Sequence, residues 1–246
     1  MSDRSENILI DVRNLTINFG GLVAVNNVSM HLGKGEILGL IGTNGAGKTT
    51  LFNMIAGALK PTAGSIYYRG HNITGKRPDT ICKLGVARTY QIVKPFAALT
   101  VLENVMVGAL LRHQDIEVAR LKSEEVLRRV NLYERKDMLG SGLNLPELKR
   151  MEIARALATE PDVLLLDEVM AGLNPTECEN AMNIVRDIQS SGISIIVIEH
   201  VMRAIMNISH RIYVLNQGLL IAEGTPTEIS ANKAVINSYL GGGGEW

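Results

Sequence analysis

A glycine-rich stretch after residue 41 has the composition and spacing of a phosphate-binding loop. It follows an apolar run, GEILGLIG, that is typical of a buried strand, and it opens a helical pattern that begins GKTTLFNMI. Glycines let backbone N–H groups wrap around phosphates, and the positive end of the following helix favours the same anions. Lys48 is predicted to reach the β- and γ-phosphates, and the Thr49 hydroxyl to ligate Mg²⁺. The predicted nucleotide-binding residues are Gly42, Thr43, Asn44, Gly45, Ala46, Gly47, Lys48, Thr49 and Thr50.

Two carboxylates follow a second apolar run, VLLLDE, at residues 163–168. Ligands of open α/β folds bind at the carboxyl ends of parallel strands, which is where Asp167 and Glu168 are expected to lie. Asp167 is predicted to hold Mg²⁺ through its water shell, and Glu168 to orient and polarise an attacking water. Alone, such a pair is equally consistent with a solvated strand end. Together with the phosphate-binding loop upstream, it indicates hydrolysis of a nucleoside triphosphate.

The elements that must position these groups alternate between strand-like and helical patterns. Residues 8–36 are expected to form short strands broken by Gly and Asn turns. Three later runs, DVLLLDE, SIIVIEH and RIYVL, are apolar throughout, as strands covered by helices on both faces are. NQG at 216–218 predicts a hairpin turn. Because the segment 92–158 has a mainly helical pattern, the predicted fold class is an α/β core with a helical insertion.

Within this insertion, two helices have clear signals. Thr100 and Glu103 have the spacing of a capping box, which predicts a helix start. The next segment, IEVARLKSEEVLRRV, has two Glu–Arg pairs at i,i+4, which are most simply a solvated helix face. The pairs are Glu124 with Arg128 and Glu125 with Arg129.

Composition is that of an ordinary soluble globular protein. The 246 residues are 46% apolar and 20% charged, with a formal net charge of zero. This balance gives no electrostatic footprint for nucleic acid, and none is expected as a partner. Cys82 and Cys178 lack metal-ligand spacing and fit structural residues in a reducing compartment. With no apolar targeting region at the N-terminus and no long apolar stretch, a cytoplasmic chain is expected, whose membrane association depends on partners.

Taken in order, these motifs resemble those of ABC transporter ATPase subunits from Ile8 to Leu240. Within that family the sequence is most similar to the ATPases of branched-chain amino acid importers, the Liv type, and AGLNP at 171–175 favours the subunit called G. The resemblance implies a P-loop α/β fold, with a mainly parallel core sheet, an antiparallel β-subdomain and a helical subdomain. It also implies a single ATPase domain over residues 1–246, in which about 8–91 and 159–246 form the nucleotide-binding core and about 92–158 the helical subdomain.

The same resemblance implies roles for three residues outside the two motifs. Phe19 falls where the family stacks an aromatic ring on adenine, the alternative being a strand aromatic packed in the core. Gln91 matches the Q-loop, which senses Mg²⁺ and the γ-phosphate, and His200 matches the switch histidine, which contacts the γ-phosphate. The implied catalytic residues are Lys48, Gln91, Glu168 and His200, and the implied Mg²⁺ ligands are Thr49, Gln91 and Asp167.

The loop LNLPE at 143–147 lies where the family has its signature loop, LSGGQ, directly before a helix that ends in ARAL. In the family two ATPase domains dimerise head to tail, and each signature loop completes the ATP site of the other chain. Asn144 keeps a polar side chain able to donate to phosphate. Pro146 removes a backbone donor, and Glu147 is expected to bring negative charge near the triphosphate. A second ATPase subunit is therefore implied, and these departures favour a heterodimer over a homodimer.

The implied function is ATP hydrolysis, with ATP and Mg²⁺, coupled to the import of branched-chain or related amino acids. The partners would be transmembrane permease subunits and, indirectly, a solute-binding protein, which would hold the chain peripherally on the inner face of the cell membrane. An alternative is a soluble ABC ATPase of an assembly complex, such as one for iron–sulfur clusters. A nucleotide-binding regulatory module without turnover would require the loss of Glu168 or Lys48, and both are present.

The expected contact with a permease lies just after Gln91. An apolar run, made of Ile92, Val93, Pro95 and Phe96, occupies what should be a loop. The functional interpretation is a groove that receives a short helix of a membrane subunit. The alternative is internal packing of the helical subdomain.

Overall fold

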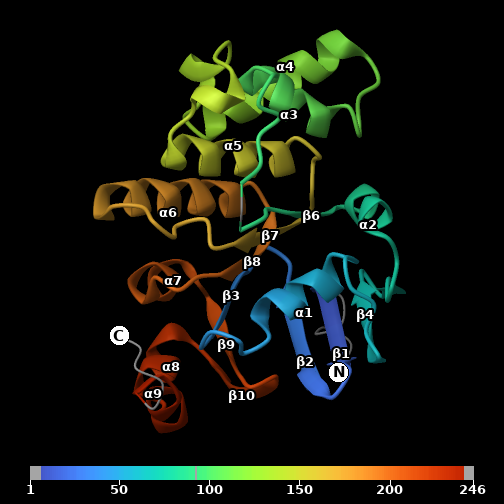
Figure 1. The fold of residues 1–246 in the computed structure, drawn as a ribbon, viewed down its shortest axis with the longest axis vertical. Helices are drawn as coiled ribbons and strands as arrows, with labels where there is room; N and C mark the ends of the chain where they lie inside the picture. Colours follow the sequence, from blue (N-terminus) through green and yellow to red (C-terminus); the bar gives the residue numbers. More distant parts are fainter. Residues whose placement is uncertain (1–6, 92, 241–246) are drawn as a thin grey trace.

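The computed structural model describes residues 7–91 and 93–240, in which two sheets support a group of helices stacked at one end (Figure 1). The first sheet is antiparallel, with the order β2-β1-β4-β5. Its strands are β1 (Ile8–Phe19), β2 (Leu22–Gly33), β4 (Ala63–Tyr68) and β5 (His71–Asn72). This sheet lies beside the helix α1 (Lys48–Ile55).

The prediction of short strands over residues 8–36 is wrong, because β1 and β2 each run for 12 residues. Asn14 and Asn27, which looked like turn residues, have φ of 50° and 52° and lie where the register between the strands shifts. The side-chain Nδ2 of Asn14 donates to Asn27 Oδ1 at 2.9 Å across the two strands. Asparagine tolerates the left-handed conformation, so the strands bend at these irregularities without ending.

The second sheet has the order β10-β9-β3-β8-β7-β6, and every pairing from β9 to β6 is parallel. Its strands are β3 (Ile37–Gly42), β6 (Val86–Arg88), β7 (Val163–Asp167), β8 (Ser194–Ile198), β9 (Arg211–Asn216) and β10 (Leu219–Gly224). β10 pairs antiparallel with β9 through the predicted hairpin turn, in which Gln217 and Gly218 both have positive φ. The predicted α/β class is thus confirmed.

Alternate residues of the parallel strands face two different cores. In β7, Leu164 and Leu166 join a cluster formed with the helices α5 (Leu145–Leu157), α6 (Pro175–Ser190) and α7 (Met202–Ile208). Val163 and Leu165 face a cluster formed with α1 and the antiparallel sheet. The parallel sheet is therefore the middle layer, which explains why its strands are apolar throughout.

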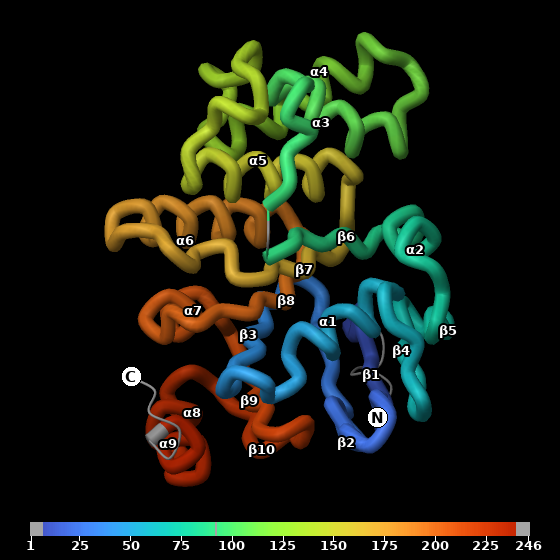
Figure 2. Tube along the Cα trace, in the orientation of Figure 1, coloured from blue at the N-terminus to red at the C-terminus, as the bar shows by residue number. Residues whose placement is uncertain are grey.

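The helical segment is inserted between β6 and β7, two strands that pair directly with each other (Figure 2). It contains α3 (Val101–Ala109), α4 (Ile116–Arg129) and α5, with short 3₁₀ turns at Tyr133–Arg135 and Gly140–Gly142. The predicted capping box is present: the Thr100 hydroxyl accepts from the Glu103 N–H at 3.1 Å, and the Thr100 N–H donates to the Glu103 carboxylate at 2.7 Å.

The expectation of a solvated face on α4 is wrong at Glu124, and the second expected pair does not form although Glu125 is exposed. Glu124 does contact Arg128, at 3.2 Å, but its carboxylate is buried and also receives Lys136 at 3.0 Å. Arg129 does not pair with Glu125 but with Asp187 of α6, at 2.6 Å. The contacts of Arg129 and Lys136 connect α4 to other segments, which periodicity within one helix cannot reveal.

The remaining helices cover the edges of the sheets. They are α2 (Pro78–Leu84), which leads into β6, and α8 (Pro226–Ala231) and α9 (Lys233–Leu240), which pack near β9 and β10. Across the residues that the structure describes, no helix combines the length and the apolar character needed to cross a membrane.

Candidate active site

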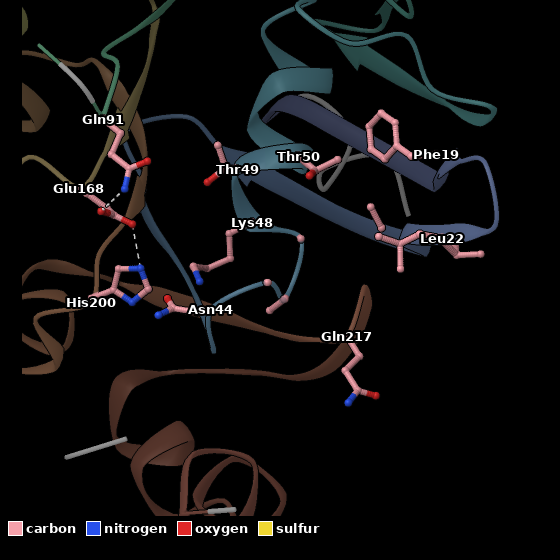
Figure 3. A pocket seen from close by; sticks show the side chains of 15 residues that line it. Phe19, Leu22, Asn44, Lys48, Thr49, Thr50, Gln91, Glu168, His200 and Gln217 are labelled. Atoms are coloured by element: carbon pink, nitrogen blue, oxygen red, sulfur yellow. Dashed lines mark hydrogen bonds and ion pairs between the residues drawn. The ribbon is translucent and has the colours of Figure 1, made fainter. Parts of the chain in front are cut away.

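A cleft of about 700 Å³ opens at the carboxyl end of β3. It is bounded by the loop before α1, by the ends of β7 and β8, and by the tips of β1 and β2 (Figure 3). The lining residues are Phe19, Leu22, Val23, Ala24, Asn44, Gly45, Ala46, Gly47, Lys48, Thr49, Thr50, Gln91, Glu168, His200 and Gln217. Most of the predicted site residues are therefore brought to one place.

The loop between β3 and α1 has a backbone that only glycine permits at two positions. Gly42 has φ of 154°, and a Cβ there would lie 2.2 Å from the Leu215 carbonyl oxygen. Gly47, the N-cap of α1, has φ of 101°, and its Cβ would lie 2.5 Å from the Ala24 carbonyl oxygen. Among the described residues no side chain caps α1, so its first N–H groups remain available to an anion.

Lys48 is folded back onto this loop. Its Nζ donates to the carbonyl oxygens of Gly42, at 2.7 Å, and Thr43, at 3.0 Å. Burial lowers the pKa of the ammonium, and the nearby carboxylates of Glu168 and Asp167 partly oppose that shift. The buried ammonium is thus bound by two carbonyl oxygens and lies near two carboxylates. A phosphate, which is more negative than a carbonyl, could replace the carbonyl oxygens as its partner.

Glu168 is the centre of a three-residue contact at the other side of the cleft (Figure 3). Gln91 Nε2 donates to Glu168 Oε2 at 2.7 Å, and His200 Nε2 lies 2.8 Å from Glu168 Oε1. The three residues follow the neighbouring strands β6, β7 and β8. Their sequence separations gave no sign of this arrangement, which comes from the order of the strands.

Asp167 lies beneath the cleft as the last residue of β7. Arg88 Nη2 donates to its Oδ2 at 2.8 Å, and its backbone N–H donates to the Thr89 hydroxyl at 3.1 Å. Burial raises the pKa of Asp167, and Arg88 partly opposes that shift. Its Oδ1 is buried and has no hydrogen-bond partner among the described residues.

The side-chain oxygen atoms at this edge of the cleft fit the ligand preferences of a Mg²⁺ ion. The buried Asp167 Oδ1, which has no hydrogen-bond partner among the described residues, is free to coordinate a cation. Asp167, Thr49 and Gln91 all have the hard oxygen atoms that Mg²⁺ prefers. Such a site is typically completed by water and substrate phosphates rather than by a cage of protein ligands.

Of two further predicted residues, one lines this cleft and the other does not. Phe19, which is 48% exposed at the end of β1, lines the cleft and does not lie in the core. Asn144 lies outside the lining and is the N-cap of α5. Its Oδ1 accepts from the Glu147 N–H at 3.0 Å, so the side-chain NH₂ is the group it has left to offer to a phosphate.

Glu147 does not present its charge as expected. Its carboxylate accepts from the Asn144 N–H at 3.1 Å and pairs with Arg135 at 3.0 Å, and the side chain is buried. Asn144 and Glu147 form a capping box, which holds the carboxylate against its own helix. The charge of Glu147 is thus offset by Arg135, and its closeness to a partner's triphosphate stays a prediction.

Sequence reasoning missed four polar residues that support the site. Arg88 and Thr89 hold Asp167, as described above. Lys149 Nζ donates to the Glu168 carbonyl oxygen at 2.6 Å, and Glu199 Oε1 accepts from the Met170 N–H at 2.7 Å. The available signal was a charged residue within or beside an apolar run, as in VAR and VIEH. Lys149 gave no such signal, because α5 contains many charged residues.

The fold and the cleft define a P-loop nucleoside triphosphatase. A model of the ABC transporter family matches residues 25–171, and a model described as a branched-chain amino acid ATP-binding cassette transporter matches residues 220–245. The chain belongs to the ABC transporter ATP-binding family.

Similar proteins support this assignment along 95% of the chain. The high-affinity branched-chain amino acid transport ATP-binding protein LivG of Salmonella typhimurium is 41% identical over 252 residues, covering 95% of this chain and 98% of LivG. The corresponding protein BraF of Pseudomonas aeruginosa is 38% identical, with the same coverage. Among solved structures, an ATP-binding cassette of an ABC transporter in its ADP conformation has a TM-score of 0.87 at 29% identity, covering 95% of this chain and 99% of its own.

Glu199 gives a testable dependence of stability on pH. Burial raises its pKa to about 7, although the Met170 N–H and Lys149 act in the opposite direction. Because the folded state then binds the proton more tightly than the unfolded state, the stability that this group contributes is complete below about pH 4.5 and is lost as pH rises through 7.

Glu199→Gln should remove this dependence. Between pH 5 and 8 the free energy of unfolding of the wild type should fall by about 2–3 kcal/mol relative to the variant. Chemical denaturation of both proteins across this range measures the difference, with Glu134→Gln, an exposed carboxylate, as the control. A wild-type-minus-variant difference that stays constant with pH would contradict the assignment.

Proposed function

We propose that this chain is the ATP-hydrolysing subunit of an importer for branched-chain or related amino acids, energising transport through transmembrane permease subunits. The contact of Gln91 and His200 with Glu168, opposite the loop that holds Lys48, carries the proposal of hydrolysis. The solute class rests on what the similar proteins are called and on the family match at residues 220–245. Those matches do not favour the alternative of a cluster-assembly ATPase.

The geometry supports a mechanism based on positioning and electrostatics. The N–H groups of the loop and of α1 would bind the phosphates, and Lys48 would exchange its carbonyl partners for them. Glu168 would orient the attacking water and accept its proton, while Gln91 and His200 fix the carboxylate. Thr49, Gln91 and Asp167 would hold Mg²⁺, which offsets phosphate charge when bound. Phe19, at the far edge of the cleft, would stack on the base.

Replacing Glu168 by Gln tests the hydrolytic role. The variant should bind ATP about as tightly as the wild type, because Gln preserves shape, but should lose at least about 100-fold in kcat, because an amide cannot accept the proton. Lys48→Ala should instead weaken ATP binding itself. Equilibrium binding of a fluorescent ATP analogue and phosphate release from the assembled complex separate the two effects. Parental turnover in Glu168→Gln would refute the role.

We also infer that the chain is held on the inner face of the membrane by a permease segment seated beside Gln91. A pocket of about 300 Å³ there is lined by Tyr90 and by residues of α2, β6, α3 and α5, among them Val107 and Arg155. Phe96 is exposed but does not line this pocket, and the Arg155 guanidinium lies 4.9 Å from its ring centre. Ile92 lies outside the described residues. The groove is therefore better probed on α3 than at Phe96.

Val107→Glu should release the chain from membranes while ATP binding persists, because a charge would enter an apolar part of the groove. Val118→Glu is the matched control, since Val118 is 40% exposed on α4 and Val107 is 47% exposed on α3. Membrane fractionation with quantitative blotting measures the effect. Equal membrane retention of the two folded variants would count against the groove.

The N-terminus of α5 favours a heterodimeric ATPase pair. The N–H groups of Asn144 and Glu147 are both used by the capping box, and Pro146 has none. Three of the four positions 144–147 thus offer no free N–H to a partner's phosphate. Losing one charge-assisted contact costs on the order of 1.5–3 kcal/mol, or roughly 10- to 150-fold in affinity. A related partner with a glycine-rich signature loop would complete the site on this chain more effectively than a second copy.

Two unequal ATP sites should follow. Inactivating Glu168 should reduce hydrolysis by the purified complex much more than inactivating the equivalent glutamate of the partner, because the site on this chain receives the better signature loop. Steady-state phosphate release from the two single variants gives the comparison, with the double variant as the baseline. Equal losses would disprove the asymmetry.

A further inference from the structure

The backbone of Glu168 is held in an unusual conformation by contacts on both sides. Its φ is 53°, in the left-handed region that non-glycine residues seldom adopt. Its N–H donates to the Ile198 carbonyl oxygen at 2.9 Å, and its own carbonyl accepts from Lys149 Nζ at 2.6 Å. A strained conformation of this kind persists only where the surroundings enforce it.

Lys149 is well suited to enforce it. The residue belongs to α5, its side chain is buried, and it does not line the cleft. A charged donor to a carbonyl in such surroundings makes a stronger bond than a neutral one. The buried Glu199 carboxylate attracts the same ammonium, and it also accepts from the Met170 N–H, two residues after Glu168. The loop that follows β7 thus makes hydrogen bonds to two buried charged side chains, Lys149 at Glu168 and Glu199 at Met170.

We propose that Lys149 is a positioning residue that aligns the Glu168 carboxylate with Gln91 and His200 by fixing the Glu168 peptide group. The inference rests on the proposed catalytic role of Glu168. Rotation of that peptide would swing the side chain, which starts from the same Cα, away from its two partners. Because Lys149 does not line the cleft and contacts only the backbone of Glu168 there, its loss should affect turnover and not the binding of ATP.

A second consequence concerns the N-terminal end of α5. The helix begins at the LNLPE loop, which the heterodimer proposal assigns to the partner's ATP site, and one turn later it carries Lys149. The same rigid helix therefore contacts the hydrolytic loop of its own chain and supplies the loop for the other site. A displacement of α5 when the partner's site closes would be transmitted to Glu168 through a single hydrogen bond.

The test compares Lys149→Met, Lys149→Arg and Lys136→Met in the full chain within the complex purified from membranes. Lys149→Met should lower kcat by about 10- to 100-fold with the KM for ATP changed less than about threefold, because a charge-assisted bond is lost outside the cleft. Lys149→Arg keeps a charged donor and should recover much of kcat. Lys136→Met is the matched control, because it also removes an ammonium from a buried carboxylate, that of Glu124, without touching the catalytic loop.

Several results would overturn the proposal. These are a Lys149→Met complex with kcat within twofold of the parent, an increase in KM that accounts for the loss, or an equal loss in Lys136→Met. If Lys149→Met does not fold, Lys149→Arg and Lys149→Gln decide, since a kcat that does not follow the presence of a charged donor refutes the role. Glu168→Gln in the same preparation separates this failure from failure of the proposed function, because parental turnover there would remove the basis for both.

Discussion

The buried ion pair between Arg88 and Asp167 is the interaction on which the arrangement of the two halves of the chain depends. It joins the carboxyl ends of β6 and β7, at 2.8 Å, where the chain leaves each of these two paired strands. Breaking such a pair leaves an uncompensated buried charge, which typically costs about 3–5 kcal/mol. The pair therefore fixes the spacing of the strands that carry Gln91 and Glu168 on their following loops.

Burial of charge is also the common physical basis of the rest of the site. Lys48, Asp167, Lys149 and Glu199 are all buried at one edge of an apolar sheet. Each charge makes the neighbouring opposite charge less costly, because an ion pair in a medium of low dielectric constant is strongly attractive while an isolated ion is strongly unfavourable. Glu168 is the group that they share, because its charge acts to raise the pKa of each of the four.

Local signals in the sequence predict the phosphate-binding loop, the strands of the parallel sheet and one helix start. The glycines of the loop, the apolar strands and the Thr100 capping box are encoded in consecutive residues, and each was predicted at the correct place. The contact among Gln91, Glu168 and His200 is encoded in the strand order β8-β7-β6, which only the resemblance to a family could suggest.

The failures of prediction have separate physical reasons. Asn14 and Asn27 gave turn signals, because the same left-handed conformation serves a turn and a strand irregularity. The orientation of Glu147 was predictable, since Asn-x-x-Glu before a helix is a capping pattern. The partners of Arg129 and Lys149 lie on other elements, and no periodicity within a helix reports on those.

The hairpin between β9 and β10 has a consequence for the thermodynamics of nucleotide binding. Gly218 lies in the turn of this hairpin. Its N–H donates to the Ala46 carbonyl oxygen of the phosphate-binding loop at 3.0 Å, and its carbonyl oxygen accepts from the Asn26 N–H of β2 at 2.8 Å. The two regions that would hold the opposite ends of a nucleotide are thus joined before any ligand arrives. Since these bonds already fix the two regions relative to each other, ATP binding loses less conformational entropy, and more of the attraction between ATP and its two contact surfaces is retained as affinity.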